Sequence, residues 1–478
     1  MKFQTSLSLF TARDRCLVRL VLILAVLLMT VACGPGTRPA DLQAVLSWPQ
    51  DPAFWTGLSA GDDLLLSQTA QARSAAFCRS MHFLPWLTRN ALYKATRVSG
   101  DAASLRHKQL FGEHLRPRSP AFIDSLILKC NWQAYPLLNT KGVTVGTTNL
   151  RALPTCRPGF LDPSLAGEGY PFDHLQYSSL WPGTPVHVSH ATVDRSWFFV
   201  ETAHVYGWVT AEDLAFVPDS LAARVMSLPL GAIVRDNSSV SDESGRFLFQ
   251  ARIGMLLPVL TVEGRKLKCL ALTADEHGQA ASREVVLDNS CISPFPIQPT
   301  AGNFAGIAGE FLGQAYGWGG LFRNRDCSAF MRDFFTPFGL WLPRNSAQQA
   351  RIGRFFDLTG RSAREKKRII LDRGVPFLTT ITMDGHIMLF LGGREGRAAV
   401  QHAVWGLRTR NILGHRGRLV IGQNVITDLE PGKEVPELDR PQGRLLNRIT
   451  GMGLLDQGIE EWSASHVQQP VVSGPEMR

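Results

Sequence analysis

The sequence predicts a multidomain α+β protein with a helical N-terminal module, two small β-barrels and a C-terminal α+β domain. At about 150 residues per domain, its 478 residues correspond to roughly three domains. The hydrophobic content of 45% and charged content of 19% exclude a largely disordered or collagen-like chain. Helical patterns give way to short, turn-punctuated strands near residue 136. We expect boundaries at 1–33 (leader), 34–135 (helical module), 136–218 and 219–298 (barrels), 299–435 (α+β domain) and 436–478 (a partly ordered extension).

The charge and motif content exclude several classes of ligand. Lys and Arg exceed Asp and Glu by nine, 50 against 41, and this excess is dilute. Nucleic-acid binding requires basic residues clustered on a face, so we predict no nucleic-acid partner. No CxxC pair and no Walker-type phosphate loop occur, so the sequence predicts neither a metal nor a cofactor.

The N-terminus has the pattern of an export leader. A basic segment ends at Arg19, and residues 20–31 form an apolar stretch that is too short for a transmembrane helix. Ala32-Cys33-Gly34 resembles a bacterial lipobox, in which the cysteine is lipidated. We therefore expect a signal peptide, a lipid anchor on Cys33 and a location in the cell envelope, on the outer membrane facing the periplasm. Plain secretion and an uncleaved anchor are the alternatives. Without Cys16 and Cys33, six cysteines remain in an oxidising compartment, which permits disulfides without specifying pairs.

Helices are expected around Leu64–Cys78 and Ala121–Leu128, with a turn at Leu84–Trp86. The segments that follow are short strands separated by turn residues, which is typical of small barrels. Trp197-Phe198-Phe199-Val200 followed by Tyr206-Gly207-Trp208-Val209 resembles the bacterial SH3 domain, and residues 219–298 resemble a second, more divergent copy. Most of these aromatic residues should form barrel cores, whereas Tyr206 is the one that we expect to border a ligand groove.

A cysteine opens an amphipathic helix in the C-terminal domain. Cys327, Phe330, Met331, Phe334, Phe335 and Phe338 have the one-face spacing of a helix, and Pro337 and Gly339 end it. The helix N-terminus favours a thiolate, and a neighbouring histidine would lower the pKa of the thiol further. An isolated cysteine on such a face is more often an inert core residue, so the interpretation depends on a partner.

Two histidines supply that partner. His386 opens one apolar strand and His402 lies in a second, with a connection at Gly392–Gly396. If the strands pair about Arg394, His386 lies directly opposite His402 and on the same face. A slip of one residue would place them on opposite faces. The sequence thus predicts a thiolate nucleophile at Cys327, a general base at His386 and an orienting group at His402.

These motifs resemble one family of enzymes. The segments Tyr316–Gly320, Asp326-Cys327-Ser328, Leu342-Pro343-Arg344, Gly385-His386 and His402 are similar to the NlpC/P60 family of papain-like cysteine peptidases. With the two barrels and the N-terminal module, the chain resembles the subgroup that cleaves γ-D-glutamyl–diamino acid bonds of peptidoglycan. The resemblance implies that Asp326 and Ser328 contact substrate, that Tyr316 lies by the oxyanion hole, and that the first barrel limits access to short peptides with a free N-terminal L-Ala.

The predicted function is therefore a DL-endopeptidase acting on peptidoglycan stem peptides, as a monomer held at a membrane by its N-terminal lipid. Two alternatives remain. The chain could be a wall-binding lipoprotein with a degenerate peptidase unit, although the intact Cys327, His386 and His402 argue against decay. The same Cys–His pair could also serve amidase or acyl-transfer chemistry.

Overall fold

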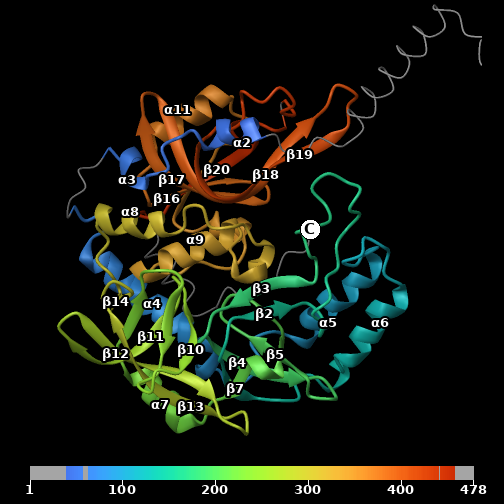
Figure 1. Ribbon diagram of the computed structural model, residues 1–478, viewed down its shortest axis with the longest axis vertical. Coiled ribbons are helices and arrows are strands. Elements are labelled where there is room, and N and C mark those ends of the chain that lie inside the picture. The colour runs from blue at the N-terminus through green and yellow to red at the C-terminus, as the bar shows by residue number, and fades with distance from the viewer. Residues whose placement is uncertain (1–38, 58–62, 441, 458–478) are drawn as a thin grey trace, which may run out of the picture.

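The computed structural model describes residues 39–57, 63–440 and 442–457. The leader and the expected lipidation site at Cys33 lie outside them. In Figure 1 the two barrels lie side by side below, and the sheet of the C-terminal domain lies above, with helices between them. Within the described part of the chain, no helix has the length and apolarity needed to cross a membrane. The six cysteines of that part are all unpaired.

The N-terminal helices divide between two neighbours. Helices α2 (Pro39–Leu46) and α3 (Pro52–Trp55) pack on the C-terminal domain, whose core includes Trp55 (Figure 1). Helix α4 (Gln68–Leu87), capped by the Ser67 side chain, passes between the domains. Helices α5 (Ala95–Ser104) and α6 (Pro120–Lys129) cover the first barrel. The described helices of this N-terminal part therefore pack on both neighbouring units, and the turn expected at Leu84–Trp86 is instead the last part of α4.

The first barrel is a seven-stranded antiparallel sheet in the order β3-β2-β6-β5-β4-β1-β7. Its strands are β1 (Thr140–Thr144), β2 (Thr148–Arg151), β3 (Gln176–Leu180), β4 (Pro185–Ala191), β5 (Trp197–Glu201), β6 (Tyr206–Thr210) and β7 (Leu214–Phe216). Tyr206 is only 1% exposed, and its hydroxyl donates to the Asp101 carboxylate of α5. The expectation that Tyr206 borders a groove is therefore wrong, because α5 covers that side of the barrel.

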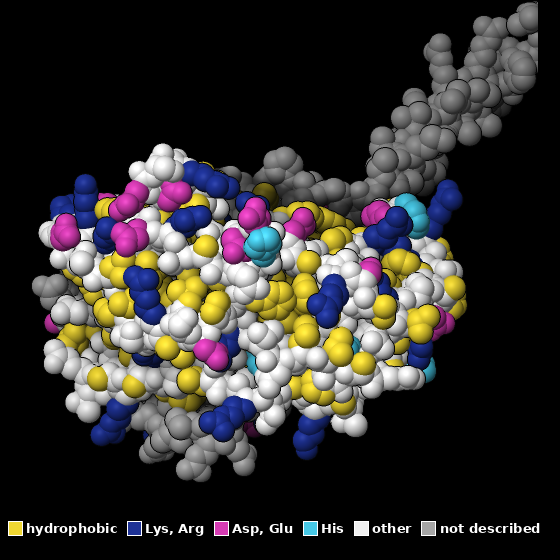
Figure 2. Space-filling view, turned by 90° about the horizontal axis from the view of Figure 1, so that it is seen from below, with side chains coloured by type: hydrophobic (Ala, Val, Ile, Leu, Met, Phe, Trp, Pro, Cys, Tyr) yellow, Lys and Arg dark blue, Asp and Glu magenta, His cyan; other side chains and the backbone are white. Residues whose placement is uncertain are grey.

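The second barrel follows helix α7 (Asp219–Ser227). It combines a five-stranded sheet, in the order β13-β12-β11-β8-β14, with a β9–β10 hairpin. The strands are β8 (Leu230–Ile233), β9 (Ser238–Ser241), β10 (Phe247–Ala251), β11 (Leu256–Glu263), β12 (Lys266–Ala274), β13 (Ala280–Asp288) and β14 (Ile292–Pro294). Seen from below, where the barrels lie, charged side chains of both signs are scattered among apolar ones (Figure 2).

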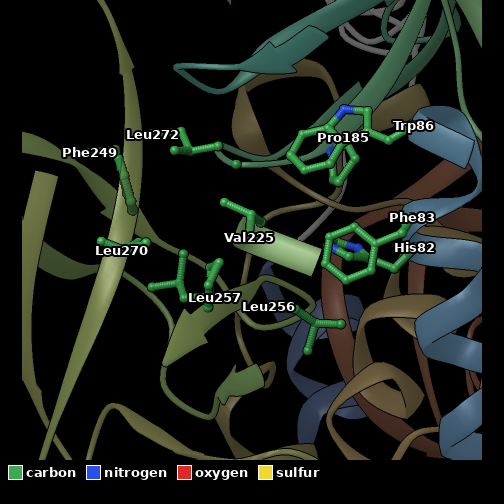
Figure 3. Close-up of a pocket in the computed structure, with 12 residues that line it drawn as sticks. His82, Phe83, Trp86, Pro185, Val225, Phe249, Leu256, Leu257, Leu270 and Leu272 are labelled. Carbon is green, nitrogen blue, oxygen red and sulfur yellow. The ribbon is translucent and has the colours of Figure 1, made fainter. Parts of the chain in front are cut away.

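An apolar seam joins α4 to both barrels. His82, Phe83 and Trp86 of α4 face Pro185 of the first barrel, and leucines of the second barrel close the other side (Figure 3). The void left between them is about 10 Å³, which is about the smallest space that holds one water molecule. Burial, with the nearby Arg79, lowers the pKa of His82 to about 4. The seam is therefore packing and not a ligand site.

The C-terminal domain is a six-stranded sheet in the order β15-β20-β16-β17-β18-β19. Its strands are β15 (Arg354–Asp357), β16 (Thr379–Met383), β17 (His386–Arg394), β18 (Arg397–Arg410), β19 (Arg416–Asp428) and β20 (Ile449–Leu454), and its helices are α8 (Ala301–Glu310), α9 (Cys327–Phe335), α10 (Ser346–Gln349), α11 (Ala363–Arg373) and α12 (Leu445–Arg448). Helix α9 packs on β17 and β18. The segment expected to be an extension from residue 436 instead supplies β20, between β15 and β16, because its apolar Ile449, Met452 and Leu454 complete the core.

Two contacts fix the barrels against α9. The Arg325 guanidinium donates to Asp236 of the second barrel at 2.5 Å and to Asp333 of α9 at 2.7 Å, and all three side chains are buried. On the other side, Gly320 takes φ +84°, and a Cβ there would lie 2.4 Å from Ser179 Oγ of the first barrel. The segment before Cys327 is thus held by both barrels.

Candidate active site

Cys327 lies at the first position of α9, as predicted. Asp326 caps the helix, its side chain accepting from Ala329 N at 2.8 Å. The apolar face of α9 points into the core, and Cys327 is 8% exposed at the edge of that core. Helix α9 ends at Phe335, and a single 3-10 turn runs on to Gly339, which takes the left-handed φ of 78°. A helix N-terminus also offers free N–H groups to a developing negative charge.

The β17–β18 hairpin brings the two histidines together, but not in the expected register. The turn is the two-residue Glu395-Gly396, both with positive φ, and the register at the turn pairs Arg394 with Arg397. Continued without change, this register would place His386 and His402 on opposite faces. A bulge between Phe390 and Gly392 shifts the pairing by one residue and returns both histidines to one face. His386 Nε2 then lies 2.7 Å from His402 Nδ1.

A threonine extends this pair and fixes its protons. His402 Nε2 lies 3.2 Å from Thr427 Oγ1 of β19, and the Thr427 hydroxyl donates to the Asp428 carbonyl at 2.8 Å. Because that hydroxyl proton is already used, Thr427 accepts from His402 Nε2–H. His402 Nδ1 is then an acceptor, and His386 Nε2 carries the proton between the rings. This network leaves His386 Nδ1 unprotonated and able to act as a base.

Sequence reasoning missed Thr427. It lies on the same face of the sheet as His402 only because the β18–β19 register pairs His402 with Val425, two residues away. No local motif marks that register, so the signal exists only in the long-range pairing.

Burial changes the charge state that the sequence suggests for the nucleophile. Cys327 and His386 line the same cavity. Burial, and secondarily the Asp326 carboxylate, raise the pKa of Cys327 to about 12. Burial, with Arg448, lowers the pKa of His386 to about 4. Both shifts favour a neutral thiol and a neutral imidazole in the unliganded site and so act against the expected resting ion pair.

A buried polar cluster surrounds the nucleophile. Asp326 Oδ2 accepts from Arg344 Nη2 at 2.7 Å and from Gly319 N at 3.0 Å. Ser328 Oγ donates to Asp326 and receives Arg344 Nη1 at 2.8 Å. Burial raises the pKa of Asp326, but Arg344 outweighs it and the net shift is downward, so the carboxylate stays ionised. Arg344, which was not among the predicted site residues, organises this cluster.

Tyr316 stands beside the nucleophile. It lines the cavity with Cys327, and its ring lies 6.0 Å from that of Trp405. Burial, then the Asp326 and Cys327 charges, raise the pKa of Tyr316 well above its ordinary value. The hydroxyl thus keeps its proton and can donate a hydrogen bond to a developing oxyanion.

Cys327, His386, Tyr316 and the cluster of Asp326, Ser328 and Arg344 line one cleft of about 720 Å³, and His402 and Thr427 are not among its lining residues. The C-terminal domain contributes most of the lining, and the first barrel contributes Ala166, Gly167, Glu168, Phe172, His174, Gln176 and Tyr177. Tyr206 is not among the lining residues. Within the described residues, no group of three or more His, Cys, Asp or Glu side chains could hold a metal ion.

Four family models match consecutive parts of the chain. They are the NLPC_P60 stabilising domain, N term (residues 20–135), the SH3 domain of SH3b1 type (158–210), the SH3 domain of SH3b2 type (219–261) and the NlpC/P60 family (313–405). Comparison with curated proteins gave no match.

One solved structure with a TM-score above 0.5 shows the same architecture. An NlpC/P60 endopeptidase from Photobacterium damselae subsp. piscicida is 24% identical, with a TM-score of 0.77 over 86% of this chain and 98% of its own. An NlpC/P60 family protein from Bacillus cereus is 15% identical, with a TM-score of 0.44 over 66% of this chain and 99% of its own. The first likeness supports the multidomain fold of barrels and C-terminal sheet.

A cysteine at a helix start, with a histidine delivered by the facing sheet, defines a cysteine-type peptidase of papain-like arrangement. The models for the N-terminal segment and for residues 313–405 both carry the NlpC/P60 name, and two SH3 domains lie between them. Residues 313–405, which hold the cysteine and both histidines, belong to the NlpC/P60 family. This membership supports peptidase activity of the peptidoglycan-hydrolase class.

Proposed function

We propose that this protein is a DL-endopeptidase that cleaves the γ-D-glutamyl–diaminopimelate bond of peptidoglycan stem peptides. The observation that carries the proposal is the His386–His402–Thr427 chain, which leaves a base at the edge of a cleft that also contains Cys327. The family membership and the two SH3 domains support a peptidoglycan substrate.

The chemistry follows from the proton positions. As substrate enters, His386 Nδ1 removes the Cys327 thiol proton and Sγ attacks the carbonyl carbon. In this proposal the Cys327 backbone N–H and the Tyr316 hydroxyl stabilise the oxyanion. The imidazolium then gives its proton to the leaving amine, which departs and leaves a thioester. Water, deprotonated by His386, attacks the thioester and releases the acid and the thiol.

Closure of the cleft by the first barrel supports a short substrate. Gln176 Nε2 donates to Gly319 O at 2.9 Å, and Ser179 Oγ donates to Gly320 O at 2.8 Å, so the barrel is bonded directly to the loop before the nucleophile. We propose that this wall admits peptide ends with a free N-terminal L-Ala, and that Asp326 and Ser328 act on substrate as well as on Arg344.

The leader supports a location. We propose export, lipidation at Cys33 and attachment to the outer membrane facing the periplasm, with the protein acting as a monomer. Metabolic labelling with a fatty-acid probe tests this: the label should appear in the wild-type protein and be lost in Cys33→Ala.

One experiment tests the proposed activity. Purified muropeptides are digested with wild type and with Cys327→Ala, and the products are identified by mass spectrometry. The proposal predicts a new diaminopimelate amino group with wild type only. Binding without cleavage by wild type would favour a wall-binding protein, and release of intact stem peptide from the glycan would favour amidase chemistry.

A further inference from the structure

Four arginines form two directly opposed pairs on the β18–β19 ribbon. The register places Arg408 opposite Arg418 and Arg410 opposite Arg416. The pairs are two residues apart, so all four share one face. All four line the cleft that contains Cys327. We call these residues the arginine ladder.

The ladder is unfavourable for the ribbon itself. Like charges directly opposite each other on a sheet are destabilising. Burial, then Arg408 and Arg448, lower the pKa of Arg418, while Glu168 acts in the other direction. Arg410 forms an ion pair with Asp439 at 3.4 Å, so neighbouring carboxylates offset part of the repulsion between these charges.

The first barrel leaves room for one of these guanidinium groups. Gly167 has φ +92°, and a Cβ there would lie 2.0 Å from Arg418 Nη2. Any larger residue would displace the arginine from the cleft wall. The position of Arg418 is thus set by both walls of the cleft.

The basic end of the cleft lies on the His386 side. A second cavity of about 620 Å³ shares Arg408, Arg448 and Asp384 with the cleft and is lined by no residue of α9 or of the first barrel. Arg448 Nη2 lies 3.5 Å from the carbonyl oxygen of Asp384, two residues before His386, and both Arg448 and His386 line the cleft. Because the histidine protonates the leaving amine, the leaving half of the substrate lies on the histidine side.

We propose that the arginine ladder, with Arg448, binds the carboxylates of the leaving half of the substrate. This inference rests on the proposed endopeptidase function and specifies its substrate. Guanidinium groups bind carboxylates in bidentate pairs, which a carboxamide does not reproduce. The enzyme therefore selects a diamino acid with a free carboxylate at its side-chain end over the amidated or decarboxylated (lysine-type) forms.

The test compares two tripeptides, L-Ala-γ-D-Glu-meso-diaminopimelate and its counterpart with a carboxamide at the side-chain end. With full-length wild type we expect kcat/KM to be at least tenfold higher for the carboxylate form, mainly through KM. Arg408→Gln and Arg418→Gln should each reduce this preference towards one. Arg283→Gln, on an exposed strand of the second barrel, is the matched control and should keep it. Thermal unfolding checks folding, and removal of one like charge should not lower Tm.

A binding arm separates this inference from the proposed function. Calorimetry with Cys327→Ala gives Kd for both peptides without cleavage. Tighter binding of the carboxylate form, lost when Arg408→Gln is added, supports carboxylate binding by the arginine ladder. This holds even if wild type cleaves neither peptide. Absence of cleavage would overturn the endopeptidase proposal and not the ladder. Equal Kd for the two peptides, or a preference that survives in both ladder variants, overturns the inference.

Discussion

Replacement of Thr427 by valine should disable the base without touching the nucleophile. Valine keeps the shape and removes the Thr427 hydroxyl that accepts the His402 Nε2 proton, at a site that is fully buried. A buried donor without a partner costs about 1–3 kcal/mol. His402 avoids this cost by moving its proton to Nδ1, which forces His386 Nε2 to accept and places the His386 proton on Nδ1, facing the substrate side.

That tautomer cannot deprotonate Cys327. If the competent tautomer loses about 1–3 kcal/mol, kcat should fall about 5- to 160-fold. The assay is steady-state hydrolysis of the tripeptide, with Tm measured in parallel. Thr427→Ser retains the hydroxyl and should keep kcat within about threefold of wild type. A threefold change corresponds to less than about 1 kcal/mol, which is the order of the energy of one rearranged hydrogen bond. A Thr427→Val enzyme with wild-type kcat would refute the proton assignment.

Three further predictions concern titration, the interdomain ion pair and the glycine loop. The pKa of His386 is about 4 in the folded protein and 6.5 in the unfolded chain, so the unfolded chain is protonated first as the pH falls. The free energy of unfolding should therefore decrease between about pH 6.5 and pH 4 because of this group. His386→Gln should make the free energy of unfolding, measured by urea denaturation, less dependent on pH in that range. Arg325→Met leaves two buried aspartates without their closest cation and should lower the free energy of unfolding by about 3–5 kcal/mol, whereas an unchanged urea midpoint would contradict the network. Gly320→Ala should reduce kcat/KM, because the added Cβ collides with Ser179 of the first barrel. Gly360→Ala is the control: Gly360 has a similar positive φ, but nothing lies within 4 Å of its added Cβ. Equal effects of the two variants would show that backbone strain alone, and not contact with the barrel, lowers kcat/KM.

The sequence predicted the local parts of the site well. The spacing from Cys327 to Phe338 indicated the helix and its N-terminal cysteine, because one-face periodicity is a local property. The pairing of His386 with His402 was expected from a direct register and is found through a bulge. The prediction that both histidines lie on one face of the sheet is correct, although the predicted direct pairing of His386 with His402 is wrong. The observed register differs from the predicted one by two residues, and a shift of two residues keeps a side chain on the same face.

Long-range packing accounts for the rest. Tyr206 looked like a groove residue because nothing in its own strand shows that α5 covers it. The charge state of Cys327 depends on how deeply other segments bury it, which the helix-end argument does not include. Strand β20 was missed because proline-rich segments on either side make residues 436–478 resemble a tail.

The place of β20 has a consequence for the order in which the sheet is completed. This strand is inserted between β15 and β16, although both are made much earlier in translation. Until residues 449–454 are synthesised, β15 has no partner in the sheet and β16 has one open edge, whereas β16 to β19, which carry the histidines, can already pair. Docking of β20 thus joins β15 to the sheet after the strands of the site have been made.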